Sequence, residues 1–84
     1  MTGEDDTLTR LQDRLHAARK NLAEAYDRRD TLAREIAAIE ATNGAGVHID
    51  LLTAYEAAAR AVLAGEADMK DAEHALAVAA EPRR

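Results

Sequence analysis

The chain has 84 residues and a formal net charge of −5, from 16 acidic and 11 basic residues. It contains no cysteine, which excludes disulfide frameworks and thiolate metal sites, and its acidic balance disfavours nucleic acid as the main partner because phosphate binding needs a basic surface. Hydrophobic residues make up 48%, but they are mostly alanine, with no Phe, no Trp and two Tyr. This composition predicts long helices in one domain of residues 1–84 that is short of bulky core residues.

No apolar run approaches the ~20 residues that cross a bilayer. The acidic, polar start of the chain is also unlike a signal peptide. We therefore expect a cytoplasmic protein with no membrane partner. Abundant alanine and a preference for arginine over lysine are typical of GC-rich bacterial genomes and of their phages.

A first helix is predicted from about residue 7 to residue 42, with an N-cap at Asp6 or Thr7. Its apolar positions alternate steps of three and four residues, the heptad spacing of a helix that packs along a seam. The seam positions are Leu8, Leu11, Leu15, Ala18, Leu22, Ala25, Arg29, Leu32, Ile36 and Ile39. One charged residue, Arg29, interrupts this apolar stripe.

The strongest break follows at residues 42–46, where asparagine and glycine can take the left-handed conformation that ends a helix. We expect a loop over residues 43–50, with Asp50 as N-cap of a second helix from about residue 51 to residue 80. That helix should stop before Pro82, because the residue before a proline avoids helical angles. Its seam positions are Leu51, Tyr55, Ala58, Val62, Gly65, Met69, Ala72, Leu76 and Ala79.

Two helices of similar length joined by a short loop should pack as antiparallel neighbours. In one register the numbers of facing residues sum to about 94, so that Leu22 faces Ala72. In the other the sum is 87, Leu22 faces Gly65, and the second helix should begin near Gly46. Both registers set large residues against small ones, as close packing requires, so the sequence leaves both open.

Several apolar residues lie outside the two seams. They are Tyr26, Ala33 and Ala37 in the first helix and Ile49, Leu52, Leu63 and Val78 in the second. A lone hairpin leaves such residues in water, whereas a wider apolar stripe is typical of helices in a bundle. The predicted fold is therefore an all-α, coiled-coil-like antiparallel hairpin with an alanine-rich seam, which forms a homodimeric four-helix bundle through Tyr26, Leu52, Tyr55 and Leu63.

The seam arginine, Arg29, has two interpretations. It can contact an anion or a partner, or its stem can pack over a small residue while its head reaches Glu66 or water. We favour the second, in which a polar seam residue fixes the register.

Chemistry-bearing clusters are sparse along the chain. Asp71 and His74 have the spacing of a carboxylate–histidine pair, but no second such pair exists, and the chain has no serine and no phosphate-binding loop. His16 is expected to be exposed and His48 to lie at the hairpin end. We therefore expect no enzyme activity, no cofactor and no metal.

Three functions from different classes remain. The first is a non-enzymatic structural or adaptor protein that self-associates and docks on larger protein partners. The second is a small nucleic-acid-binding regulator that uses the basic residues of the first helix, namely Arg10, Arg14, Arg19, Lys20, Arg28, Arg29 and Arg34. The third is a secreted helical-hairpin effector, which is similar in size and topology to small type VII secretion substrates but lacks their Trp-x-Gly turn.

Overall fold

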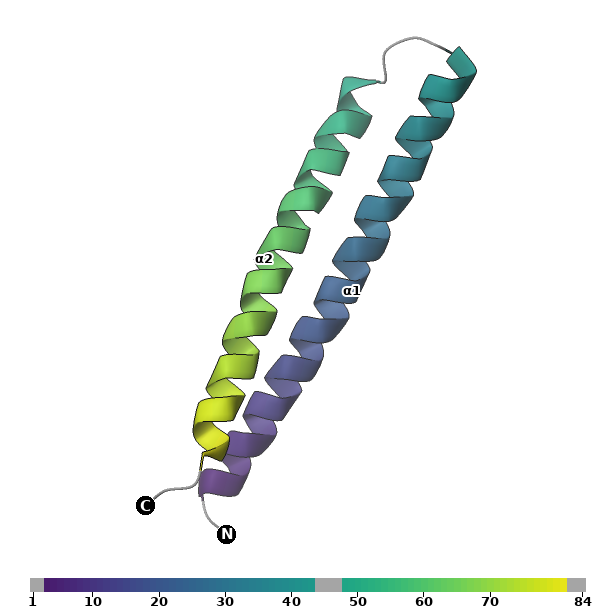
Figure 1. The fold of residues 1–84 in the computed structure, drawn as a ribbon. Coiled ribbons are helices and arrows are strands. Elements are labelled where there is room, and N and C mark those ends of the chain that lie inside the picture. The colour runs from purple at the N-terminus through teal and green to yellow at the C-terminus, as the bar shows by residue number, and fades with distance from the viewer. Residues whose placement is uncertain (1–2, 44–47, 82–84) are drawn as a thin grey trace.

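The protein is a hairpin of two long helices in a computed structural model that describes residues 3–43 and 48–81. Helix α1 spans Gly3–Asn43 and α2 spans Ile49–Ala80, and Figure 1 shows them side by side in opposite directions. The molecule measures 64 × 20 × 16 Å. Over the described ranges there is no strand, so the expected all-helical hairpin is confirmed.

Helix α1 begins at Gly3, four residues before the expected start. The predicted N-caps, Asp6 and Thr7, are therefore wrong, because both residues lie inside the helix. A negative charge such as that of Asp6 is favourable in a first helical turn, where free amide groups carry partial positive charge. The acidic residues at the start of the chain are therefore compatible with the first turn of a helix.

Helix α2 begins at Ile49, and its N-cap is His48 rather than the predicted Asp50. The His48 Nδ1 atom accepts a hydrogen bond of 3.2 Å from the Asp50 backbone amide. This bond supplies one of the partners that the first amides of a helix lack. The predicted left-handed bend at residues 44–46 lies outside the described residues, and the helix ends at Ala80, as expected before Pro82.

The register of the hairpin is the one in which facing residue numbers sum to 87. A Cβ atom built on Gly65 would lie 3.1 Å from Leu22 Cδ1 and 3.6 Å from Leu22 Cα, so these two residues face each other. Ala72 instead clusters with Leu15 and Ala18, and the register summing to 94 is wrong. The sequence also predicted that this register needs a second helix starting near Gly46, and this is wrong. Helix α2 begins at Ile49, and the last residues of α1 extend past that level at the loop end (Figure 1).

The core is thin and built from small side chains. Its buried members are Leu15, Ala18, Leu22, Ala58, Val62 and Ala72. Met69 and Leu76 pack against one end of it and are half-buried. In the described part of the chain no large side chain is fully buried. Neither described helix combines the length and hydropathy that crossing a membrane requires.

Candidate interaction surface

The outer side of α2 carries large aliphatic residues that the hairpin does not cover. Ile49 is 72% exposed, Leu52 is 40% exposed and Leu63 is 68% exposed. Leu52 and Leu63 are eleven residues apart, which is close to three helical turns, and Ile49 precedes Leu52 by three residues. The three side chains therefore share one side of the helix, which we call the outer side of α2. A fourth exposed residue, Val78, lies off this side.

The remaining two predicted interface residues, Tyr26 and Tyr55, are half-buried. The Tyr26 hydroxyl donates a hydrogen bond of 2.8 Å to Glu66 Oε2 on α2. Because Glu66 follows Leu63 by one helical turn, this bond places Tyr26 at the border of the outer side of α2. Tyr26 thus contacts α2 at Glu66, whereas Tyr55 occupies a seam position.

The hydrogen bond to Glu66 also changes the acidity of the tyrosine. The pKa of Tyr26 is raised, first because its hydroxyl donates to the Glu66 carboxylate and then because of partial burial and the negative charge of Glu66. The positive charge of Arg29 opposes this rise. The neutral phenol is therefore the form that links the two helices.

The seam arginine, Arg29, interacts with neighbouring residues of its own helix. Its head does not reach Glu66, because Arg29 Nη2 lies 3.1 Å from Asp30 Oδ1 and the guanidinium lies 5.1 Å from the centre of the Tyr26 ring. The stacked guanidinium keeps contact with an aromatic face while its charge is paired. The register places Arg29 opposite Ala58, a small buried residue, so the expected large-against-small arrangement is retained.

The described residues offer no convergent metal-binding cluster. Over residues 3–43 and 48–81 no group of three His, Cys, Asp or Glu side chains is placed to hold a metal ion, and Asp71, His74 and His16 are all exposed. A hollow of about 420 Å³ lies on α1 and is lined by Asp27, Arg28, Thr31 and Leu32. These four residues come from one helix, so the hollow lacks the facing walls that enclose a substrate.

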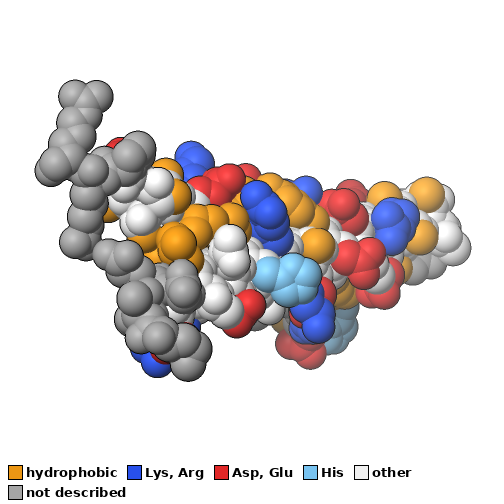
Figure 2. All heavy atoms as spheres, turned by 90° about the horizontal axis from the view of Figure 1, so that it is seen from below, with side chains coloured by type: hydrophobic (Ala, Val, Ile, Leu, Met, Phe, Trp, Pro, Cys, Tyr) orange, Lys and Arg blue, Asp and Glu red, His pale blue; other side chains and the backbone are white. Residues whose placement is uncertain are grey.

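The arginines of α1 are partly engaged by acidic residues. Arg14 Nη2 lies 3.6 Å from Asp68 Oδ1, and Arg19 Nη2 lies 4.0 Å from Glu73 Oε2, both across the seam. Figure 2, viewed from the end of the hairpin that carries the termini, shows basic and acidic side chains interleaved along the molecule. That view presents no continuous basic strip of the kind that tracks a phosphate backbone.

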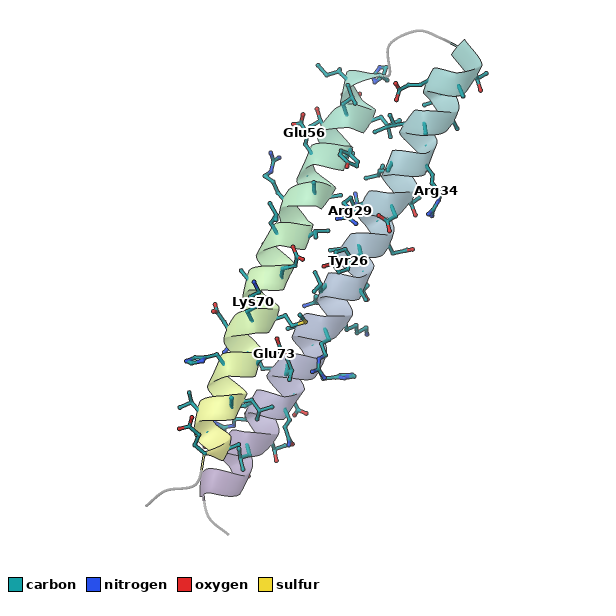
Figure 3. The ribbon with its side chains drawn as sticks, in the orientation of Figure 1. Tyr26, Arg29, Arg34, Glu56, Lys70 and Glu73 are labelled. Atoms are coloured by element: carbon teal, nitrogen blue, oxygen red, sulfur yellow. The ribbon has the colours of Figure 1, made fainter. Side chains whose placement is uncertain are left out.

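Sequence reasoning missed a row of five residues on α2, which we call the outer row. Its members, spaced seven residues apart and all exposed, are Ile49, Glu56, Leu63, Lys70 and Ala77. The seven-residue spacing was the available signal, but attention to apolar residues alone passes over Glu56 and Lys70. In Figure 3 neither of these two residues lies between the helices, whereas Glu73 lies on the edge of α2 toward α1.

Comparison with known proteins identifies no relative of the chain. No family model, no curated protein and no solved structure matches the chain.

Proposed function

We propose that the protein is a non-enzymatic structural or adaptor protein that acts through helix–helix association, and that it self-associates as a dimer of hairpins. The observation that carries the proposal is the exposure of Ile49, Leu52 and Leu63 on one side of α2. Monomeric proteins rarely gather large aliphatic residues on one exposed side, and such a patch is typical of an interaction site.

The surface area of the hairpin supports the same proposal. The chain exposes 6444 Å² of accessible surface. A compact monomer of 9.1 kDa has about 4,900 Å² by the usual scaling with mass, so the excess is about 1,500 Å². A stable interface of standard size buries about 800 Å² on each partner. A second hairpin packed along the first with an interface of this size would cover about half of the excess.

Sedimentation equilibrium over a wide dilution series tests the proposal. The expected mass is twice the 9.1 kDa of one chain at high concentration, with dissociation on dilution. A monomer at every concentration would contradict self-association.

A variant with Ile49, Leu52 and Leu63 all changed to Gln should dimerise about a hundredfold more weakly or worse, because each substitution removes apolar area from the interface. The control places glutamines at Ala57 and Ala64, two exposed positions that each follow a residue of the outer side by one and are therefore turned about 100° away from it. This control should dimerise like the wild type. Equal weakening of both variants would show that the outer side has no special role.

A further inference from the structure

The outer row of α2 has a symmetric pattern. Leu63 is its centre, Glu56 lies seven residues before it and Lys70 seven residues after it. Seven residues are nearly two helical turns, about 10.5 Å along the axis, so the three side chains stay on one side. A twofold axis that passes by Leu63 and reverses the helix direction exchanges the positions of Glu56 and Lys70.

Both charges of this row are free within the hairpin. In the described ranges neither Glu56 nor Lys70 takes part in an ion pair or a side-chain hydrogen bond. Asp68 and Glu73, on the parts of α2 that face α1, both have arginine partners. The uncommitted charges of the outer row therefore flank the exposed Leu63 on the side that α1 does not cover.

Resting on the self-association proposed above, we infer that a second copy of this chain packs antiparallel on the outer side, with the twofold axis at Leu63. Leu63 contacts Leu63 of the second copy, and each Glu56 lies level with Lys70 of the second copy. Ile49 lies level with Ala77 of the second copy, so a large side chain again meets a small one. The overlap from residue 49 to residue 77 covers about 42 Å of each α2 helix.

The parallel arrangement, in which both loops lie at the same end, offers these charges no free partner. There the twofold axis runs along the bundle, and α2 of one copy faces α1 of the other at the same level. The register of the hairpin sets Glu56 level with Arg29 and Asp30, which pair with each other, and sets Lys70 level with Arg19, which pairs with Glu73. In the antiparallel arrangement each Glu56 instead lies level with the unpaired Lys70 of the second copy.

Charge reversal tests the arrangement. Glu56→Lys alone and Lys70→Glu alone should each weaken dimerisation by about tenfold, because each homodimer then contains two like-charged pairs. An equimolar mixture of the two variants should recover wild-type affinity as a heterodimer. In that heterodimer one chain carries lysine at both positions and the other carries glutamate at both, so both contacts are complementary. The defects of the single variants should shrink at high salt.

Engineered cysteines give an independent readout, because the natural chain has none. Leu63→Cys should form a disulfide-linked dimer on mild oxidation, since residues on the twofold axis face each other. Glu56→Cys should not link to itself, because the two copies of position 56 are about 21 Å apart along the axis. A mixture of Glu56→Cys and Lys70→Cys should yield the mixed dimer.

The two proposals fail separately. The antiparallel arrangement would be overturned if the wild type dimerises but Leu63→Cys does not cross-link and the mixture of charge-reversed variants still dimerises weakly. That result would leave the proposal of self-association intact. A wild-type monomer at all concentrations would overturn the self-association itself.

Discussion

The inner and outer sides of α2 differ in the size of their apolar residues, in the opposite sense to most globular proteins. The residues that α2 buries against α1 are Ala58, Val62 and Ala72, which are 2%, 3% and 0% exposed. Its larger residues Ile49 and Leu63 are 72% and 68% exposed. Met69 and Leu76 add bulk at the edge of the inner side, but Ile49 and Leu63 lie where the hairpin does not cover them.

Small residues on the inner side have a clear role. Together with Gly65, they let α2 approach the leucines of α1 closely, and the 3.1 Å between a Cβ built on Gly65 and Leu22 Cδ1 measures how close. The cost is a thin core, since burial of alanine removes little apolar area from water. The leucines of the hairpin are thus divided between those that pack against the other helix, such as Leu15 and Leu22, and those that stay exposed, such as Leu63.

The largest expected difference in stability is between two leucine-to-alanine variants, one at a buried leucine of the hairpin and one at an exposed leucine on the outer side of α2. Leu22→Ala should destabilise the monomeric hairpin by about 3 kcal/mol, because Leu22 is 5% exposed and its loss leaves a cavity. Leu63→Ala should cost the monomer less than about 0.5 kcal/mol, because Leu63 already faces water. Chemical unfolding followed by circular dichroism in dilute protein measures both, and similar values for the two variants would contradict the comparison.

A second variant overfills the inner side. Gly65→Leu should destabilise the hairpin by about 2 kcal/mol, because the added side chain meets Leu22. The control Ala67→Leu, at an exposed position of α2, should be nearly neutral. Gly65→Ala should change the stability by less than about 1 kcal/mol, since the gain in helix propensity offsets a small shift of the flexible Leu22 tip. Thermal melts of the three variants should give this order.

The third prediction concerns the hydrogen bond at the border between the two sides. Tyr26→Phe should lower the melting temperature at neutral pH, because it removes the bond to Glu66. The pKa of Tyr26 is raised in the folded protein, so the bond contributes fully below the ordinary tyrosine value of about 10 and is lost as the pH rises through the folded value. The difference between wild type and variant should therefore close in alkaline solution. A difference independent of pH would assign the effect to packing.

The smallest expected effect is that of the cross-seam ion pairs. Arg14 and Asp68 are 46% and 54% exposed in their side chains, so reversing either charge should cost about 0.5 kcal/mol or less. The double variant Arg14→Asp/Asp68→Arg should recover that loss. A double-mutant cycle at low and high salt measures the coupling, and a coupling above about 1 kcal/mol would contradict the solvent-exposed geometry.

Heptad spacing was enough to predict the helices and the hairpin, because the seam residues recur regularly in both segments. It could not decide the register, since Leu22 meets a small residue in either one. Helix starts were also missed, because Asp6 and Asp50 suit both a cap and a first turn. Heptad spacing identified Leu52 and Leu63 as apolar residues outside the seam, and both are exposed. It does not predict which residues the head of Arg29 contacts, and these are Tyr26 and Asp30 of the same helix.

The central claim, that a second chain covers the outer side of α2, is tested most directly by methyl nuclear magnetic resonance with a water-borne paramagnetic relaxation agent. The methyl groups of Leu63 and Ile49 should be strongly relaxed in dilute protein and become protected as the concentration rises. Those of Val62, on the inner side, should stay protected at every concentration. Leu63 methyl groups that remain fully exposed at the highest concentration would contradict the claim.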